Sequence, residues 1–215
     1  MQDMEDKTVV ITGATSGLGR ATALQLAQKG ASVVIIARSN TKANEVINEI
    51  KKEGGKGQFI ISDLSSMKDT KEAAESVSKV VDRLDVLINN AGAHFPKYRE
   101  TPEGFESTLA LNYLSPFLLT HHLIEQMKQT ASDYGEARVI NITSIMHKSP
   151  INWDDLNYKN TTYHSNTAYY QSKHLLTSLT YYMSRKLKET DITVNCIHPG
   201  LVKTALIHSD YAFPM

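Results

Sequence analysis

The sequence is poor in the features that mark several classes of protein. It contains a single cysteine, Cys196, so no disulfide can form within the chain, which suits a reducing compartment. No apolar run approaches the roughly 18–20 residues that cross a bilayer, so we expect no integral membrane segment. The acidic start, Met1 to Asp6, lacks the basic and apolar parts of a signal peptide. These absences together favour a cytoplasmic protein.

An excess of charge of one sign is also missing. Lys and Arg number 23, as do Asp and Glu, so the formal net charge is zero. Such a chain does not attract nucleic acid or an acidic membrane through its overall field. Cysteine and histidine do not have the spacing of zinc ligands, and the adjacent His121 and His122 should point to different helix faces. We therefore predict no metal site and no nucleic-acid partner.

The sequence does contain a regular alternation of short apolar runs with helical patterns. Strands are predicted at residues 8–11, 32–37, 58–61, 85–88, 138–142 and 192–197. Helices are predicted at residues 21–28, 40–52, from 66 onward, 105–129 and 167–187, and Pro116 should kink or break the fourth of these. The strands are continuously apolar, which predicts burial on both faces. The alternation favours an α/β fold with a doubly wound parallel sheet of Rossmann type, in one domain over residues 1–215.

A glycine-rich turn joins the first predicted strand to the first predicted helix. Its glycines, Gly13, Gly17 and Gly19, permit a tight bend and a close approach of the backbone to a pyrophosphate. The helix N-terminus that follows favours negative charge. Ser16 and Leu18 lie in the same turn. A turn of this composition can also exist without a ligand, but its place between a strand and a helix favours a nucleotide site.

The ends of the next strands predict which nucleotide binds. An acidic residue after the second strand would bind the ribose hydroxyls of NAD, whereas an arginine accommodates the additional phosphate of NADP. Arg38 stands there, so NADP(H) is favoured over NAD(H); the alternative is a solvated arginine. Asp63, followed by Leu64, ends the third strand, where its carboxylate could meet the adenine. Small residues that leave room for the cofactor follow the fourth strand: Asn90, Ala91 and Gly92.

Tyr169 and Lys173 are four residues apart and share one face of a predicted helix. A nearby ammonium group should lower the pKa of the phenol. An acid or base with a pKa near the working pH is what the interconversion of an alcohol and a carbonyl needs. Tyr170 is a weaker candidate, because the residue four positions after it is His174. With the glycine turn, the pair predicts a nucleotide-dependent oxidoreductase.

Taken in order, these features resemble the short-chain dehydrogenase/reductase family, from about Lys7 to Ile207. The matching residues are the glycine turn, Asp63, Asn89 to Gly92, Asn112, Ser144, Tyr169, Lys173, and His198 to Gly200 with Thr204. Within the family, the chain is most similar to the retinol dehydrogenase-like and protochlorophyllide oxidoreductase-like group. That similarity lies in residues 101–106, 111–114 and 117–120 and in the long interval between Ser144 and Tyr169.

The resemblance implies a role for each matching residue. Tyr169 would be the general acid/base, and Lys173 would lower its pKa and hold the nicotinamide ribose. Ser144 would hydrogen-bond the substrate oxygen, while the neighbouring Thr143 would be a buried strand residue. Asn112 would hold a water in a relay to Lys173. The residues that would fix the nicotinamide are Pro199, Gly200, Val202 and Thr204.

The resulting prediction is an NADP(H)-dependent enzyme that interconverts a lipophilic alcohol and its aldehyde or ketone. Four aromatic residues hint at an apolar site but can simply pack: Phe95, Tyr98, Trp153 and Tyr163. Family members usually continue well beyond the position of Gly200, so we expect this chain to lack their C-terminal strand and helix and to expose its sixth strand as an edge. That expectation motivates the alternative, a nucleotide-binding regulatory or scaffold protein without turnover.

The two long predicted helices, around residues 117–127 and 167–187, are each rich in apolar side chains. In the second of them these are Leu175, Leu176, Leu179, Tyr182, Met183 and Leu187. Only one stripe has to face the sheet, so a surplus would suit self-association. Related enzymes commonly pair through these helices, which predicts a homodimer. The alternative is that Tyr181, Tyr182 and Arg185 face water.

Overall fold

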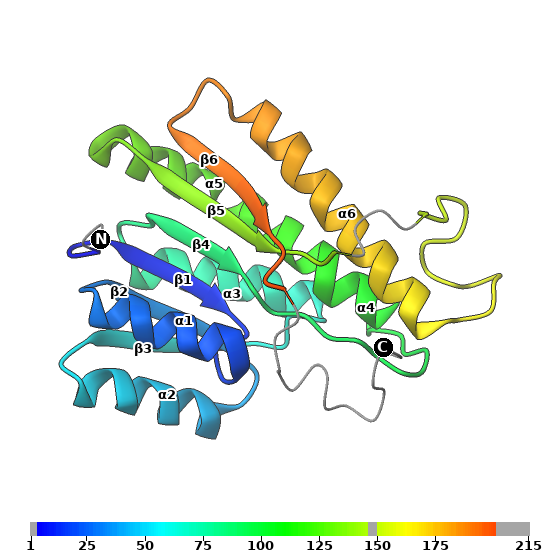
Figure 1. The fold of residues 1–215 in the computed structure, drawn as a ribbon, viewed down its shortest axis with the longest axis horizontal. Helices are drawn as coiled ribbons and strands as arrows, with labels where there is room; N and C mark the ends of the chain where they lie inside the picture. The colour runs from blue at the N-terminus through cyan, green and yellow to red at the C-terminus, as the bar shows by residue number, and fades with distance from the viewer. Residues whose placement is uncertain (1–3, 146–149, 201–215) are drawn as a thin grey trace.

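The computed structural model describes residues 4–145 and 150–200. They form a six-stranded parallel sheet with the strand order β3-β2-β1-β4-β5-β6 (Figure 1). The strands are β1 (Thr8–Thr12), β2 (Ser32–Ala37), β3 (Lys56–Ile61), β4 (Val86–Asn89), β5 (Ala137–Ile142) and β6 (Ile192–Ile197). The helices are α1 (Gly17–Gln28), α2 (Asn40–Lys52), α3 (Met67–Val80), α4 (Ser107–Leu109), the π-helix η1 (Ala110–Leu114), α5 (Ser115–Tyr134) and α6 (Ser165–Lys186). The predicted doubly wound parallel sheet is confirmed.

The sheet has a separate hydrophobic core on each face. Successive side chains of a strand point to opposite faces, so Val9 and Ile11 of β1 pack with α1 and α2, while Val10 packs with α3 and α5. Leu187, just after α6, belongs to the same core as Val10. Because both faces are covered there, β1, β2 and β4 are buried almost throughout, as their apolar sequences predict.

The prediction that every strand is buried on both faces is wrong for the edge strands β3 and β6, and also for β5, in which every second residue is only partly buried. In β6, Ile192 and Val194 are buried but Thr193 and Asn195 are exposed. β3 likewise alternates between more exposed and less exposed residues. Within the described residues β6 lies at the edge of the sheet, as expected, and Cys196 on it is only partly buried. An edge strand has helices over less of its surface, which leaves one set of alternating side chains in contact with solvent.

Two local signals in the sequence predict helix boundaries correctly. Ser66 is the N-cap of α3, and its hydroxyl accepts a hydrogen bond of 3.1 Å from the backbone nitrogen of Asp69. The predicted break at Pro116 is also confirmed, since a π-helical turn, η1, ends immediately before α5, which has this proline in its first turn. Asn112 lies fully buried inside that turn.

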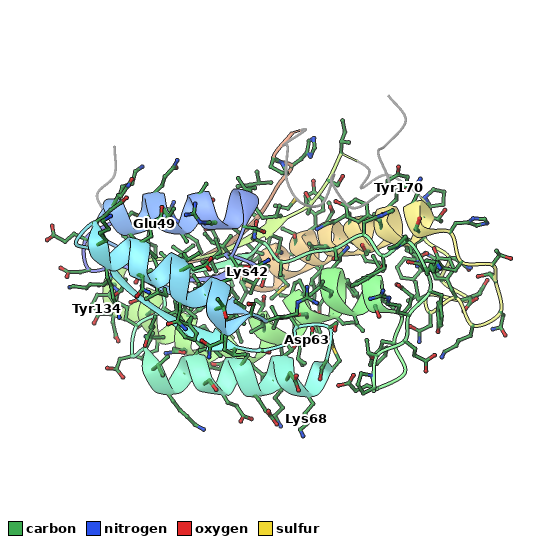
Figure 2. All side chains as sticks on the ribbon, turned by 90° about the horizontal axis from the view of Figure 1, so that it is seen from below. Lys42, Glu49, Asp63, Lys68, Tyr134 and Tyr170 are labelled. Atoms are coloured by element: carbon green, nitrogen blue, oxygen red, sulfur yellow. The ribbon has the colours of Figure 1, made fainter. Side chains whose placement is uncertain are left out.

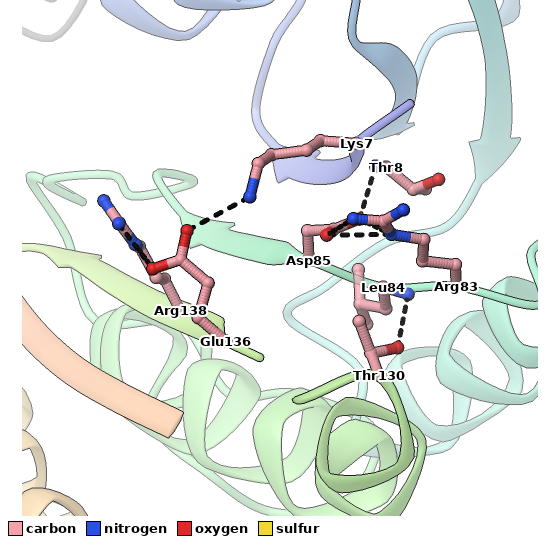
Figure 3. Close-up of polar contacts among 8 residues, drawn as sticks. All are labelled: Lys7, Thr8, Arg83, Leu84, Asp85, Thr130, Glu136 and Arg138. Carbon is pink, nitrogen blue, oxygen red and sulfur yellow. Dashed lines mark hydrogen bonds and ion pairs between the residues drawn. The ribbon is translucent and has the colours of Figure 1, made fainter. Parts of the chain in front are cut away.

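The amino ends of the central strands are joined by ionic hydrogen bonds (Figure 3). The buried carboxylate of Asp85, just before β4, accepts a 2.8 Å bond from the backbone nitrogen of Thr8 in β1. Arg83 donates to the same carboxylate through Nε and Nη2, and this bond raises the pKa of the arginine. Lys7 donates to Glu136, beside β5. These contacts align β1, β4 and β5, so that their carboxyl ends meet at the opposite edge of the sheet.

Candidate functional site

The turn between β1 and α1 can be built only with glycine at two positions. Gly13 has a φ of +66°, and a Cβ there would lie 2.8 Å from the Cα of Ala91. A Cβ on Gly19 would lie 2.6 Å from the backbone oxygen of Gly13. Contacts this short are not tolerated, so side chains are excluded from a cradle that faces the loop after β4. The space left by the missing side chains fits a pyrophosphate, which approaches the backbone closely.

The loops after β1 and β4 are held together by direct hydrogen bonds. The amide nitrogen of Asn90 donates to the backbone oxygens of Thr12 (2.9 Å) and Gly13 (3.2 Å). The hydroxyl of Thr12 accepts bonds from the backbone nitrogens of Asn90 (3.0 Å) and Ala91 (2.8 Å). The predicted cofactor residue Asn90 therefore shapes the glycine turn with its side chain.

The remaining predicted nucleotide residues follow the same edge of the sheet. Ser16 is the exposed N-cap of α1, and its side chain makes no capping bond. Arg38, after β2, is exposed and has no ion pair with the described part of the chain. The carboxylate of Asp63 accepts bonds from the backbone nitrogen (3.0 Å) and hydroxyl (2.8 Å) of Ser65. Leu64 is buried in the core, and Leu18 is half-buried.

Tyr169 and Lys173 lie on the buried face of α6, and both side chains are almost fully enclosed. The Tyr169 hydroxyl is hydrogen-bonded to Ser144, in the loop after β5. Lys173 Nζ donates a 2.8 Å bond to the backbone oxygen of Ile142 and lies 5.8 Å from the centroid of the Tyr169 ring. Figure 2 shows Tyr170, the next residue on α6, and Tyr134, at the end of α5, toward opposite ends of the molecule. Because Ile142 ends β5 and Ser144 follows it, the phenol lies at the carboxyl end of the sheet, where the glycine turn also lies.

Asn112 joins the loop after β4 to α6. Its amide nitrogen donates to the backbone oxygen of Ala93 (3.0 Å) and to the hydroxyl of Ser172 (3.0 Å), and its oxygen accepts from the backbone nitrogen of Ala93 (2.9 Å). A Cβ added to Gly92 would lie 3.2 Å from this oxygen and 3.4 Å from Lys173 Nζ. The fold therefore brings Asn112, Gly92 and Lys173 together from three separate elements.

The acid–base properties of the pair differ from the sequence prediction. Burial raises the pKa of Tyr169 above its ordinary value, and the hydrogen bond from Ser144 offsets only part of this rise. Burial also lowers the pKa of Lys173 from 10.5 to about 8. The fall in the pKa of Tyr169 that its spacing from Lys173 predicted is therefore not seen in the protein alone, where burial is the largest cause of the opposite shift.

The lowered pKa of Lys173 predicts a pH-dependent stability. The folded state favours the neutral amine more than the unfolded state does, so this residue costs stability below its folded pKa, and that cost disappears as the pH rises toward 10.5. Between about pH 7.5 and about pH 9.5, the parent should gain about 2 kcal/mol of unfolding free energy relative to Lys173→Met. Urea denaturation of both proteins at both pH values measures this difference. Lys42→Met, at an exposed position of α2, controls for the loss of a lysine. If the unfolding free energies of the parent and of Lys173→Met depend on pH in the same way, the prediction is contradicted.

The structure also tests predictions about Thr143, the residues after β6 and the four aromatic residues. Thr143 is a buried residue whose backbone nitrogen bonds the oxygen of Ile197 (2.9 Å), as predicted. Pro199 and Gly200 follow β6, with Gly200 at a φ of +81°, while Val202 and Thr204 lie outside the described residues. Of the four aromatic residues, Tyr163 packs through a 2.8 Å bond to the backbone oxygen of Phe95, whereas Trp153 is 70% exposed.

The apolar helix faces are mostly used within the chain. Leu175, Leu176 and Leu179 are buried, whereas Tyr181 and Tyr182 on α6 are exposed to solvent. His121 stacks on Phe117, and the centroids of the His121 and His122 rings lie 5.4 Å apart at an interplanar angle of 70°. Among the described residues, no helix has the length and apolar character to cross a bilayer, and no cluster of His, Cys, Asp or Glu could hold a metal.

The sequence analysis did not identify two residues at this end of the fold. The half-buried ring of His94 contacts Tyr169 edge to face, with a centroid distance of 5.7 Å. Glu106 is fully buried, and its carboxylate accepts bonds from the backbone nitrogens of Thr108 (2.7 Å) and Leu109 (2.8 Å) at the start of α4. The position of His94 two residues after Gly92 was the only local signal for the first. A glutamate just before a helix was the signal for the second.

Comparison with known proteins agrees with this architecture. The sequence model for short chain dehydrogenase matches residues 7–213. Human retinol dehydrogenase 13 is 36% identical over 203 residues, which cover 93% of this chain and 60% of that protein. Human polyprenol dehydrogenase is 37% identical over 204 residues, which cover 93% of this chain and 62% of that protein. The chain thus spans about 60% of the length of these curated relatives.

Solved structures share the fold. The Pseudomonas aeruginosa RhlG/NADP active-site complex has a TM-score of 0.80 and 28% identity, covering 97% of this chain and 78% of that chain. The 3-ketoacyl-(acyl-carrier-protein) reductase from Brucella melitensis, in complex with NADH, has a TM-score of 0.78 and 27% identity, covering 96% of this chain and 80% of that chain. From the family match, the parallel sheet and the glycine turn at its carboxyl edge, we conclude that this chain belongs to the short-chain dehydrogenase/reductase family and is retinol dehydrogenase-like.

Proposed function

We propose that this chain is an NADP(H)-dependent oxidoreductase that interconverts a lipophilic alcohol and its aldehyde or ketone, in one domain over residues 1–215. The observation that carries the proposal is the buried Tyr169 phenol, bonded to Ser144 and lying beside Lys173. The names of two relatives, retinol dehydrogenase 13 and polyprenol dehydrogenase, support a lipophilic alcohol as the substrate class.

Each residue at the carboxyl edge has a distinct part in this proposal. Gly13, Gly17 and Gly19 admit the pyrophosphate to the N-terminus of α1, and the nicotinamide, when bound, supplies or accepts a hydride. Ser144 bonds the substrate oxygen. Tyr169 gives that oxygen a proton in reduction and removes the proton in oxidation. Asn112 holds the loop after β4 against α6.

The directions in which the pKa values of Tyr169 and Lys173 shift are consistent with proton donation by Tyr169. Because burial raises the pKa of Tyr169, the phenol keeps its proton at neutral pH until a carbonyl oxygen beside it gains negative charge. Lys173 has a pKa of about 8, so it is mostly charged at pH 7 and stabilises the phenolate that forms as the proton leaves. Nicotinamide binding adds its own groups to this environment, with the Lys173 amine as the proposed partner of the ribose.

The test is turnover of a panel of apolar aldehydes and ketones with NADPH, followed by absorbance of the reduced cofactor. Consumption of NADPH that depends on an apolar carbonyl is the expected result. The panel should include short polar carbonyls, which we expect to be turned over poorly. Tight NADP binding with no turnover of any carbonyl would favour the alternative of a nucleotide-binding protein that regulates or scaffolds.

The cofactor preference depends on Arg38 in this proposal. NADP should bind more tightly than NAD, and Arg38→Asp should reduce or reverse the ratio of the two affinities by about 10–100-fold, the effect of one charge-assisted hydrogen bond. Calorimetric titration of both proteins with both cofactors measures the ratio. Lys29→Asp makes the same charge change at an exposed position after α1 and should leave the ratio unaltered. Equal affinities of the parent for the two cofactors would mean that Arg38 is a solvated surface residue.

A homodimer through α5 and α6 is part of the same proposal. The exposed apolar groups that support it are Phe117, which is stacked on His121, and Tyr181 and Tyr182. Burying them against a second copy would remove this surface from water. Light scattering on a fresh size-exclusion peak should give the dimer mass at two concentrations, and the monomer mass at both would rule the dimer out.

A further inference from the structure

Residues 150–163, which precede α6, are folded around a buried carboxylate. Asp155 is only 8% exposed, and its oxygens accept bonds of 2.7, 2.9 and 2.9 Å from the backbone nitrogens of Lys159, Asn160 and Thr161. Asn157 ties the segment to the turn before α4, because its amide oxygen accepts a 3.0 Å bond from the backbone nitrogen of Glu106. The chain therefore reaches Tyr163, directly before the N-cap of α6, along a fixed path.

The hydroxyl of Tyr163 joins three elements of the candidate site. It donates a 2.8 Å bond to the backbone oxygen of Phe95, in the loop after β4, and lies 3.2 Å from Oγ1 of Thr108 in α4. Since the single phenolic proton is used on Phe95, the Thr108 hydroxyl is the donor in the second contact. The ring itself is held edge to face by Tyr98 and Tyr158, with centroid distances of 5.8 and 5.3 Å. One oxygen atom thus connects the start of α6 to α4 and to the loop after β4.

The loop after β4 is the part of the site that packs against the Lys173 amine. A Cβ added to Gly92 would lie 3.4 Å from Lys173 Nζ, so the loop leaves little free space there. Asn112 holds the next residue, Ala93, through both its backbone nitrogen (2.9 Å) and its backbone oxygen (3.0 Å). The bond from Tyr163 holds the loop two residues further on. Two anchors on one short segment fix its direction as well as its position, which a single anchor does not.

Tyr158 provides a natural comparison, because its ring lies beside that of Tyr163 but its hydroxyl is placed differently. The residue is 9% exposed, and its ring is in edge contact with the Tyr163 ring. Its buried hydroxyl oxygen has no hydrogen-bond partner among the residues that the structure describes. Removing an unpaired hydroxyl leaves no other group unsatisfied, whereas removing the Tyr163 hydroxyl releases the oxygen of Phe95. The two tyrosines therefore separate the effect of the bond from the effect of the ring.

We propose that Tyr163 is a positioning residue for the reaction at Tyr169, and that it acts by fixing the loop after β4 against the start of α6. The inference rests on the proposed function. Tyr163 contacts no reacting atom and exchanges no proton with the substrate. Its hydroxyl sets how Gly92 lies against Lys173, and so where the amine lies when it stabilises the phenolate of Tyr169. Proton transfer depends steeply on such placement, since a displacement of about 1 Å can lower a rate by about 10²-fold.

The cofactor end of the same loop has anchors of its own. Asn90 and Ala91 are bonded to Thr12 in β1, and these bonds do not involve Tyr163. Loss of the Tyr163 hydroxyl should therefore change the placement of the loop near Lys173 without changing the affinity for the nucleotide. This split between turnover and cofactor binding is the expected signature of a positioning residue.

Tyr163→Phe tests the inference, because it removes one oxygen atom and keeps the ring. The kcat for reduction of an apolar carbonyl should fall by about ten-fold, as expected for a displacement of less than about 1 Å, while the Kd for NADPH stays within about two-fold of the parent value. Tyr158→Phe is the matched control and should keep the kcat of the parent. Steady-state rates at saturating NADPH and calorimetric titration of all three proteins measure these quantities.

Three results would overturn the inference. The first is an unchanged kcat in Tyr163→Phe. The second is an equal loss of kcat in both variants, because that result points to the packing of the aromatic rings and not to the bond with Phe95. The third is a fall in NADPH affinity as large as the fall in kcat, because a generally loosened site, and not a displaced amine, has that effect.

Hydrogen exchange of the Ala93 amide provides a test that needs no turnover. This amide donates to Asn112, so its exchange rate reports the opening of the loop after β4. The rate should rise by about ten-fold in Tyr163→Phe and stay at the parent value in Tyr158→Phe. Equal rates in the parent and Tyr163→Phe would overturn the inference and leave the proposed function intact. If the rate rises but the parent reduces no carbonyl, the proposed function fails, and the role of Tyr163 in catalysis fails with it.

Discussion

Replacing Tyr169 with phenylalanine should lower the turnover of an apolar carbonyl by about 10²–10⁴-fold, the usual contribution of a positioned general acid. The substitution removes only the hydroxyl that is bonded to Ser144. The ring keeps its edge contacts with His94 and Tyr170, so the loss in unfolding free energy should be about 1 kcal/mol. Steady-state rates with NADPH, together with calorimetric titration of the cofactor, separate the loss of turnover from any loss of binding.

Tyr170→Phe is the matched control for that experiment. Its ring lies next to Tyr169, with a centroid distance of 6.1 Å, and it is the tyrosine that spacing rejects as the acid. Turnover should survive in this variant. Parent-like turnover in Tyr169→Phe, or loss of turnover in Tyr170→Phe alone, would contradict the assignment of Tyr169 as the general acid/base.

Gly13→Ala should cost about 3 kcal/mol of unfolding free energy or more, and should also abolish tight cofactor binding. The backbone at Gly13 has a φ of +66°, which strains any residue with a Cβ. The added carbon would also lie 2.8 Å from the Cα of Ala91, so the loops after β1 and β4 must separate. Urea denaturation measures the first effect, and calorimetric titration with NADPH measures the second.

Gly54→Ala separates the two reasons why Gly13→Ala should destabilise the fold, which are the left-handed backbone and the close approach to Ala91. Gly54 has a φ of +82°, but a Cβ there would meet no atom within 4 Å. This variant should lose only about 1–2 kcal/mol, the cost of the left-handed backbone, and keep its cofactor affinity. Equal losses in the two variants would show that the close approach to Ala91 has no energetic consequence.

Local features of the sequence were sufficient for most of the elements. The α2 helix and the strands β2 and β6 have the predicted bounds, because residues such as Gly54 and Gly55 after α2 end an element within a few positions. The capping of α3 by Ser66 and the break before Pro116 are equally local effects. The parallel sheet follows from the alternation of elements, which permits few other arrangements.

The candidate site was only partly accessible to the same reasoning. Tyr169 and Lys173 share a helix, so their spacing alone places them on one face. Asn112, Gly92 and Lys173 are far apart in the sequence, so their spacing does not predict that they lie close together. Their proximity depends on how η1, the loop after β4 and α6 pack against one another. The contact of His94 with Tyr169 likewise joins residues far apart in the chain.

The order of strands and helices, the glycine turn and the Tyr169–Lys173 pair were determined by the sequence alone, because each arises from neighbouring residues. Burial was decided by the tertiary structure. It leaves alternate residues of the edge strand β6 in solvent, and it raises the pKa of Tyr169 where charge spacing had predicted a fall. The physical reason is that desolvation depends on every element packed around a side chain, and no short stretch of sequence contains that information.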